Sequence, residues 1–215
     1  MSVVTIWGQL GSGAQEAGRK IADRLQADYV DREIIAEVAA RLHRQEQEVV
    51  AKEMPPSGLL DRIAEALGSN YAFGDGLAGA YLPMGQIPLD DSRYLQALES
   101  VIKELARSQP LVILGRGSQF ILKDHPGVLH VLLVAPLEAR VKRVMQDFHL
   151  SQEAAKQEIS SVDNSLRAFF KRYFKTAPED PKHYDLVVNT ERFSLQATAS
   201  LVVDALPFRE QGVHP

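Results

Sequence analysis

The sequence contains no cysteine, which excludes disulfide bonds, thiolate metal sites and a catalytic thiol. It also has no apolar run that approaches the ~20 residues needed to span a bilayer. The chain enters a β-branched run at Val3 without the basic and apolar regions of a secretory signal. We therefore expect a soluble, cytoplasmic protein without a membrane partner.

An excess of positive charge is missing as well. The chain carries 24 Lys and Arg residues against 28 Asp and Glu residues, a net charge of −4. Nucleic-acid binding usually needs a dominant basic face, so we expect no nucleic-acid partner. The six histidines lack metal-ligand spacing, and we predict no metal ligands from them. Residues 1–215, of which 45% are hydrophobic, suffice for a single domain, and composition leaves a homo-oligomer open.

A glycine-rich turn near the N-terminus is the most informative feature that is present. It follows a short β-branched run and precedes a helical pattern. Glycine lets the backbone bring its N–H groups close to an anion, and a helix N-terminus adds a partial charge of ~0.5 e. The alternative is a plain strand-to-helix turn that packs tightly. The residues that would cradle a phosphate are Gly8, Gly11, Ser12, Gly13, Ala14 and Gln15.

The turn has the shape of a Walker A motif, G-x-x-x-x-G-K-[ST], but lacks the last two side chains of that motif. Ala14 and Gln15 stand where the motif has lysine and Ser or Thr. The lysine would bring a positive charge to the β- and γ-phosphates, and the hydroxyl would bind Mg²⁺. The backbone half of the motif is therefore present and the side-chain half is absent.

Short apolar segments alternate with helical patterns along the chain. This alternation predicts βαβ units and an α/β fold with a mostly parallel, five-stranded sheet, in which ligands bind at the carboxyl ends of the strands. The expected strands are 3–7, 28–30, 111–114, 129–134 and 186–189. The expected helices are 15–25, 32–52, 92–107, 136–148, one from an N-cap at Ser151 toward Tyr173, and one from a cap at Ser194 to about Leu206, with a frayed tail from Pro207.

Two segments interrupt this alternation. Met54–Asp91 is rich in Gly and Pro and holds a short helical pattern near Leu59–Leu67. A loop of this length is often a lid or a binding element, although a packing or oligomer-contact arm is an equal alternative. Asp147–Asp180 is charged and aromatic, and its bland interpretation is a solvated helical face.

Several arginines follow expected strands or lie on the charged segment. Arg140 and Arg143 are three positions apart on one helix and share a face, and Arg167 lies four positions after Asp163, with which it can pair. Arg116 comes at the end of the 111–114 strand. Together such arginines can bind phosphoryl oxygens, because a guanidinium donates two hydrogen bonds to one phosphate. Taken singly, each arginine is better explained as a surface residue.

Asp31 and Arg32 follow the second expected strand, beside the glycine-rich turn. A nucleotide-type substrate would lie at this position. Asp31 can accept a hydrogen bond from a base or a ribose, or it can cap the next helix, and the sequence leaves both alternatives open.

With these residues in hand, the chain resembles the cytidylate kinase-like family of P-loop nucleoside-monophosphate kinases over about residues 3–206. The resemblance rests on the order and spacing of several runs rather than on any one of them. These runs are Gly11–Gly13, Ile21–Ala22, Tyr29–Ile35, Val112–Gly117, His130–Val131, Ala135–Arg143, Asp163–Arg167 and Tyr184–Thr190.

The resemblance implies a P-loop NTPase-type three-layer sandwich with a core of 1–53, 92–146 and 181–206, an NMP-binding insertion at 54–91 and a helical lid at 147–180. It implies ATP and Mg²⁺ at the glycine-rich turn, with no protein ligand for Mg²⁺ identified, and CMP or dCMP as the acceptor. The catalytic residues that would clamp the transferred phosphoryl group are Arg140, Arg143 and Arg167. The residues on the substrate side are Asp31, Arg32, Arg116, which would meet the acceptor phosphate, and Asp163.

The chain departs from the family pattern at three places. Ala14 replaces the loop lysine, and Leu114 replaces an aspartate that is expected to organise Mg²⁺. The spacing from Asp163 to Arg167 is one residue longer than the family's Asp-x-x-Arg. An arginine finger alone is worth ~10³–10⁵ in rate, so these departures bear more on catalysis than on nucleotide binding.

Three hypotheses follow from the sequence. The first is a kinase that transfers the γ-phosphoryl group of ATP to a nucleoside monophosphate, which the resemblance implies to be CMP or dCMP. The second is a nucleotide-binding or regulatory protein without turnover. The third is a kinase for another small acceptor, because a fold does not fix its substrate.

Overall fold

A computed structural model describes residues 2–31, 33–42 and 91–210 of the chain. The expected insertion at 54–91, apart from Asp91, lies outside the described residues, as do its short helix at 59–67 and the 43–52 part of the expected helix at 32–52. The described residues fall into two compact units. The first holds those of 1–31, 99–139 and 179–215, and the second those of 32–98 and 140–178.

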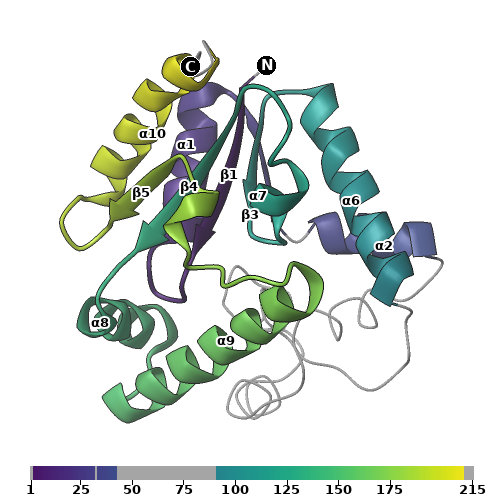
Figure 1. The fold of residues 1–215 in the computed structure, drawn as a ribbon. Helices are drawn as coiled ribbons and strands as arrows, with labels where there is room; N and C mark the ends of the chain where they lie inside the picture. The colour runs from purple at the N-terminus through teal and green to yellow at the C-terminus, as the bar shows by residue number, and fades with distance from the viewer. Residues whose placement is uncertain (1, 32, 43–90, 211–215) are drawn as a thin grey trace. The chain divides into compact units, whose positions relative to one another are not determined.

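A five-stranded, fully parallel sheet forms the centre of the first unit (Figure 1). Its order is β2-β3-β1-β4-β5, so the chain leaves β1 toward one edge and later crosses to the other. Ligands bind at such a switch point, outside the carboxyl ends of the strands. The parallel sheet and all five expected strands are confirmed, with the bounds β1 Val3–Gly8, β2 Asp28–Val30, β3 Leu111–Leu114, β4 Val128–Val134 and β5 Leu186–Asn189.

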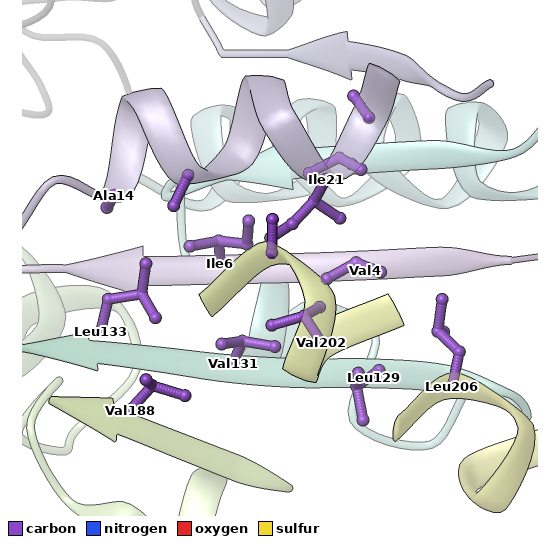
Figure 2. Close-up of a cluster of buried hydrophobic side chains, with 14 residues drawn as sticks. Val4, Ile6, Ala14, Ile21, Leu129, Val131, Leu133, Val188, Val202 and Leu206 are labelled. Atoms are coloured by element: carbon purple, nitrogen blue, oxygen red, sulfur yellow. The ribbon is translucent and has the colours of Figure 1, made fainter. Parts of the chain in front are cut away.

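One face of this sheet is covered by two helices, α1 (Ala14–Leu25) and α10 (Leu195–Glu210) (Figure 2). Ile6 of β1 packs in a buried cluster with Ile21 of α1 and Val202 of α10, and all three are 0% exposed. Burying a side chain of this size contributes ~1.5–3 kcal/mol. This packing holds β1 in place, and the glycine-rich turn begins at its carboxyl end.

The helix α10 extends beyond its expected end. Its N-cap is confirmed, because the backbone N–H of Ala197 donates to Ser194 Oγ at 3.1 Å. The expectation that the tail frays from Pro207 is wrong, since the helix continues to Glu210. Arg209 fixes the last turn: its Nε donates to the carbonyl of Val128 at 3.2 Å and lies 3.2 Å from Asp185 Oδ1.

Two short elements of the first unit have no counterpart in the sequence expectation. They are α7 (Ser118–Ile121), which lies next to β1, and the 3₁₀ turn η1 (Pro181–His183). Neither is long enough to show a helical period. Gln119 of α7 donates to Tyr184 Oη at 2.9 Å, and burial raises the pKa of that tyrosine.

The second unit is helical in its described part. It contains α2 (Glu33–Leu42), the start of α6 (Asp91–Ser108), most of α8 (Leu137–Phe148) and α9 (Gln152–Tyr173). Ser151 caps α9 as expected and accepts from the N–H of Ala154 at 3.3 Å. The aromatic residues of α9 are not a solvated face: Phe169 and Phe170 are buried, and the ring of Tyr173 packs at a tilt against Tyr94 of α6, with ring centroids 5.1 Å apart. No helix in the described ranges is long and apolar enough to cross a membrane.

The sheet face opposite α1 and α10 holds a buried histidine. His130 of β4 is 5% exposed, and its Nδ1 hydrogen-bonds with Thr5 Oγ1 of β1 at 2.7 Å. Its backbone N–H donates to Asp185 Oδ2 at 2.8 Å. Burial lowers the pKa of His130 below its ordinary value of 6.5; the charge of Asp185 opposes this shift and that of Arg209 adds to it.

This lowered pKa predicts a loss of stability in mild acid. Below about pH 6.5, His130 binds a proton in the unfolded chain, whereas in the folded chain its lowered pKa keeps it neutral to a lower pH. The contribution of His130 to the free energy of unfolding is therefore complete above that pH. It is lost as the pH falls, by at most about 1.4 kcal/mol per pH unit for one proton. Urea unfolding between about pH 7.5 and 5.5 should show a shallower pH dependence in His130→Gln than in the wild type. The exposed-site control His149→Asn should keep the wild-type slope, and equal slopes in all three proteins would contradict the prediction.

Candidate functional site

The turn between β1 and α1 is set by two glycines with left-handed backbones. The N–H of Ser12 donates to the carbonyl of Gln9 at 2.9 Å, which closes a turn around Gly11 with φ 78°. Gly13 follows with φ 79°. Glycine takes such angles without the steric cost of a Cβ. The spacing of the two glycines thus fixes the shape of residues 8–15, which we call the glycine loop.

The glycine loop leads into α1, whose N-terminus has no side-chain cap. Gly13 is the N-cap of α1 and supplies no side-chain hydrogen bond, whereas α9 and α10 begin with serine caps. The N–H groups of a first helical turn have no acceptor within the helix, and they carry the positive end of the helix dipole. An anion held at this end can accept from the amides of Ala14 and Gln15.

The buried hydroxyl of Ser12 is a further donor in the glycine loop that can bind an anion. Ser12 is 0% exposed, and within the described part of the chain its Oγ has no hydrogen-bond partner. It lies against Gly8, where a Cβ would collide with Ser12 Oγ and come within 2.8 Å of Ala14 Cβ. A buried hydroxyl without a partner costs ~1–3 kcal/mol, and a phosphate oxygen is an acceptor that would satisfy it. The loop therefore fits a phosphate group.

The side chains at and near the glycine loop provide no ligand for a metal ion. Ala14 contributes a buried methyl group at the lysine position, and Leu114 at the end of β3 packs against the hydrophobic cluster. Across residues 2–31, 33–42 and 91–210, no group of three or more His, Cys, Asp or Glu side chains could hold a metal ion. We therefore assign Mg²⁺ neither a protein ligand nor a step of the reaction.

A second polar group lies at the carboxyl ends of β2 and β3. Arg116 Nη2 is 3.4 Å from Asp31 Oδ1, and the two side chains are 12% and 11% exposed. Arg116 has φ 58° between Gly115 and Gly117, which have φ 73° and 70°. A left-handed backbone at a residue other than glycine costs on the order of 1–3 kcal/mol of conformational free energy. Such strain persists where the surrounding structure enforces it, often at ligand-binding sites. Here the N–H of Gly115 donates to the carbonyl of Ile6 at 2.8 Å, which ties the strained turn to β1.

The second unit contains a buried ion pair. Arg140 Nη1 of α8 donates to Asp163 Oδ2 of α9 at 2.9 Å, and the side chains are 8% and 7% exposed. Each charge is removed from water and compensated by the other, so the pair joins α8 to α9. The sequence placed Arg140 with the catalytic arginines and Asp163 with the substrate, but gave no sign that they meet.

The remaining expected residues differ in their exposure. Arg143 is half-buried on α8, and Arg167 is exposed on α9. Arg32 lies outside the described residues. The structure thus brings Asp31 to Arg116 in the first unit and Arg140 to Asp163 in the second, while the roles given to these residues stay predictions.

One residue with a direct hold on the glycine loop was missed. Thr190, just after β5, donates from its Oγ1 to the carbonyl of Ser12 at 2.7 Å. The available signal was its place directly after an expected strand. A contact across 178 positions of sequence leaves no local pattern, so the sequence assigned Thr190 no role beyond its place in the Tyr184–Thr190 run.

Comparison with known proteins finds a family match along most of the chain. The sequence pattern of the cytidylate kinase-like family matches residues 3–192. A cytidylate kinase of Ignicoccus hospitalis is 23% identical over 202 residues, 94% of this chain and 97% of that protein. A cytidylate kinase of Methanopyrus kandleri is 30% identical over 112 residues, 48% of this chain and 58% of that protein.

Two further similarities support less: one covers a small part of the other protein, and the other is a structural match at low sequence identity. A uronate isomerase of Corynebacterium glutamicum is 33% identical over 93 residues, 43% of this chain but only 18% of that protein. The crystal structure of an uncharacterized protein from Eubacterium ventriosum superposes with a TM-score of 0.66 at 16% identity, over 97% of this chain and 100% of that one. At this identity the likeness shows the fold alone. The chain spans less than two thirds of the uronate isomerase and of the M. kandleri protein.

Replacing Gly13 by alanine should impair anion binding more than stability. The methyl group would come within 2.7 Å of Leu195 Cδ2, and a left-handed alanine adds about 1 kcal/mol of strain. We expect Gly13→Ala to bind ATP about tenfold or more weakly in calorimetry. Gly127→Ala is the control, because Gly127 has a similar φ of 76° and precedes β4. Wild-type affinity in Gly13→Ala would show that the glycine loop is not the site.

Removing one partner of the Arg140–Asp163 pair should destabilise the protein. Arg140→Met leaves a buried carboxylate without this guanidinium, which typically costs ~3–5 kcal/mol of unfolding free energy. The double variant Arg140→Met, Asp163→Leu should regain much of this loss, because no lone charge is then buried. Arg107→Met, at an exposed site on α6, should change stability by less than about 0.5 kcal/mol. A wild-type denaturation midpoint in Arg140→Met would contradict the structural role of the pair.

Proposed function

The chain belongs to the cytidylate kinase-like family, and on that premise we propose that it transfers the γ-phosphoryl group of ATP to CMP or dCMP, which yields ADP and CDP or dCDP. The observation that carries the proposal is the glycine loop at an uncapped helix N-terminus. Its left-handed glycines, its first-turn amides and the buried hydroxyl of Ser12 form a donor set for phosphate oxygens.

In the proposed reaction, an oxygen of the acceptor phosphate attacks the γ-phosphorus of ATP. The bond from that phosphorus to the β,γ-bridging oxygen breaks, and its electron pair leaves with ADP. Charge therefore builds up on the β-phosphate. Fixed amides and a helix dipole aimed at that group stabilise the charge without having to reorient during the reaction.

We assign the acceptor to the Asp31 and Arg116 pair. Both residues follow strands that are neighbours in the sheet, and they already meet at 3.4 Å. The guanidinium of Arg116 suits the acceptor phosphate, and the carboxylate of Asp31 suits a hydroxyl or amino group of the nucleoside. The strained backbone of Arg116 supports a ligand-binding role for this turn.

Arg140, Arg143 and Arg167 are our candidates for the oxygens of the transferred phosphoryl group. Arg143 and Arg167 are the more accessible of the three. Arg140 shares its charge with Asp163, and we propose that it contributes mainly by holding α8 on α9. ATP and the nucleoside monophosphate are the partners in this proposal, and a cytoplasmic location and a homo-oligomer stay predictions.

A second candidate is a nucleotide-binding protein without turnover. Two observations favour it: the buried methyl group of Ala14 at the lysine position, and the packing of Leu114 where a carboxylate is expected. Binding through backbone amides survives these changes, whereas phosphoryl transfer loses two charged groups. Transfer to a small acceptor other than a nucleoside monophosphate is the third alternative.

An ADP-release assay with saturating Mg-ATP and each nucleoside monophosphate in turn tests the proposal. We expect turnover to be highest with CMP or dCMP. Arg116→Met should raise the KM for the acceptor about tenfold or more and leave the KM for ATP unchanged, since the guanidinium is assigned to the acceptor alone. Arg107→Met, on the exposed surface of α6, is the matched control. Nucleotide binding without turnover would favour the second candidate, and the absence of nucleotide binding would contradict both.

A further inference from the structure

The segment after β5 is a rigid turn built from its own hydrogen bonds. The N–H groups of Arg192 and Phe193 donate to the carbonyl of Asn189 at 3.0 and 3.1 Å, and Asn189 Oδ1 accepts from the N–H of Glu191 at 3.0 Å. The N–H of Thr190 donates to the carbonyl of Val134 at 2.9 Å, which extends the pairing of β5 with β4 by one residue. The backbone of Thr190 is therefore fixed to the sheet.

From this fixed backbone, the side chain of Thr190 reaches the glycine loop. Thr190 is 3% exposed, and its Oγ1 donates to the carbonyl of Ser12 at 2.7 Å. The carbonyl of Val134 is a more distant acceptor at 3.3 Å. The hydrogen bond to Ser12 is short and buried, and it joins the glycine loop to the far end of the sequence.

Leu195 holds the next residue of the glycine loop from the same segment. A Cβ at Gly13 would lie 2.7 Å from Leu195 Cδ2 and 3.1 Å from Leu195 Cδ1. The side chain of Leu195 therefore packs directly on the Cα of Gly13. Together, Thr190 and Leu195 contact two consecutive residues of the loop, on either side of the Ser12–Gly13 peptide bond.

This peptide bond is the weak point of the glycine loop. In a trans peptide the carbonyl and the N–H point in opposite directions, so the direction of the Ser12 carbonyl determines that of the Gly13 N–H. Glycine takes positive and negative φ about equally well, so Gly13 itself does little to prevent this peptide from flipping. A flip would replace an N–H donor by a carbonyl oxygen in the anion site.

We propose that Thr190 is a positioning residue, whose hydroxyl locks the Ser12–Gly13 peptide so that the Gly13 N–H stays directed into the anion site. The inference rests on the proposed function, because it assumes that the glycine loop binds phosphate. The lock matters more in this chain than in a loop with lysine, since Ala14 leaves the backbone donors to hold the anion without that charge.

Three variants test the lock. Thr190→Val keeps the shape of the side chain and removes the hydroxyl, and Thr190→Ser restores the hydroxyl. Thr198→Val is the matched control, because Thr198 is 0% exposed on α10 and its Oγ1 has no hydrogen-bond partner in the described part of the chain. Each variant is examined by ATP calorimetry, by thermal unfolding and by hydrogen exchange of the Gly13 amide without nucleotide.

We expect Thr190→Val to bind ATP about tenfold more weakly and to exchange the Gly13 amide faster, while Thr190→Ser stays within about threefold of the wild type. Thr198→Val should match the wild type in both readouts. Wild-type affinity and exchange in Thr190→Val would overturn the lock. So would an affinity loss that Thr190→Ser does not repair, because it would point to packing rather than to the hydroxyl.

The failure of the proposed function can be told apart from failure of the lock. If the wild-type protein binds no nucleotide, the proposed function fails, and hydrogen exchange alone then decides about the hydroxyl. Faster Gly13 exchange in Thr190→Val, repaired by Thr190→Ser, supports the lock in that case. Unchanged exchange overturns it.

Discussion

The direction of a few backbone N–H groups at the start of α1 is the constraint on which the rest of the first unit depends. β1 is the central strand of the parallel sheet, and its buried side chains fix the point where the glycine loop begins. The left-handed Gly11 and Gly13 then turn the chain into α1. Because Gly13 provides no side-chain cap, the N–H donors of the first turn are available to an external acceptor.

The loss of the lysine changes where the binding energy must come from. A mobile ammonium group can follow a phosphate, whereas backbone amides act only if they are already in place. The contacts of Thr190 and Leu195 supply that order from the other end of the chain. The same sheet edge carries Asp31 and Arg116, whose strained turn is tied to β1 through Gly115. The glycine loop after β1 and the Asp31–Arg116 pair after β2 and β3 thus lie at the carboxyl ends of neighbouring strands.

Much of this architecture could be predicted from local patterns. The continuous apolar runs of β1, β3 and β4 placed these strands to within one residue, because strands buried on both faces have little room for polar residues. The more exposed edge strands β2 and β5 were also placed to within one residue. Serines before helical patterns placed the caps of α9 and α10. The short α7 was missed because four residues show no period, and α10 was ended too early because the hold of Arg209 on Val128 is a contact distant in sequence.

The site was predictable to the same degree and for the same reason. The glycine loop is a local pattern, so its turn into a helix could be predicted, while its role in binding stays a prediction. The pairing of Arg140 with Asp163 and the hold of Thr190 on Ser12 depend on the fold and leave no trace in spacing. The most direct measurement for the central claim is a titration of the ¹⁵N-labelled protein with ADP, followed through the amide resonances of Gly13, Ala14 and Gln15. The account predicts saturable downfield shifts of these amide protons, and their invariance at saturating ADP would contradict it.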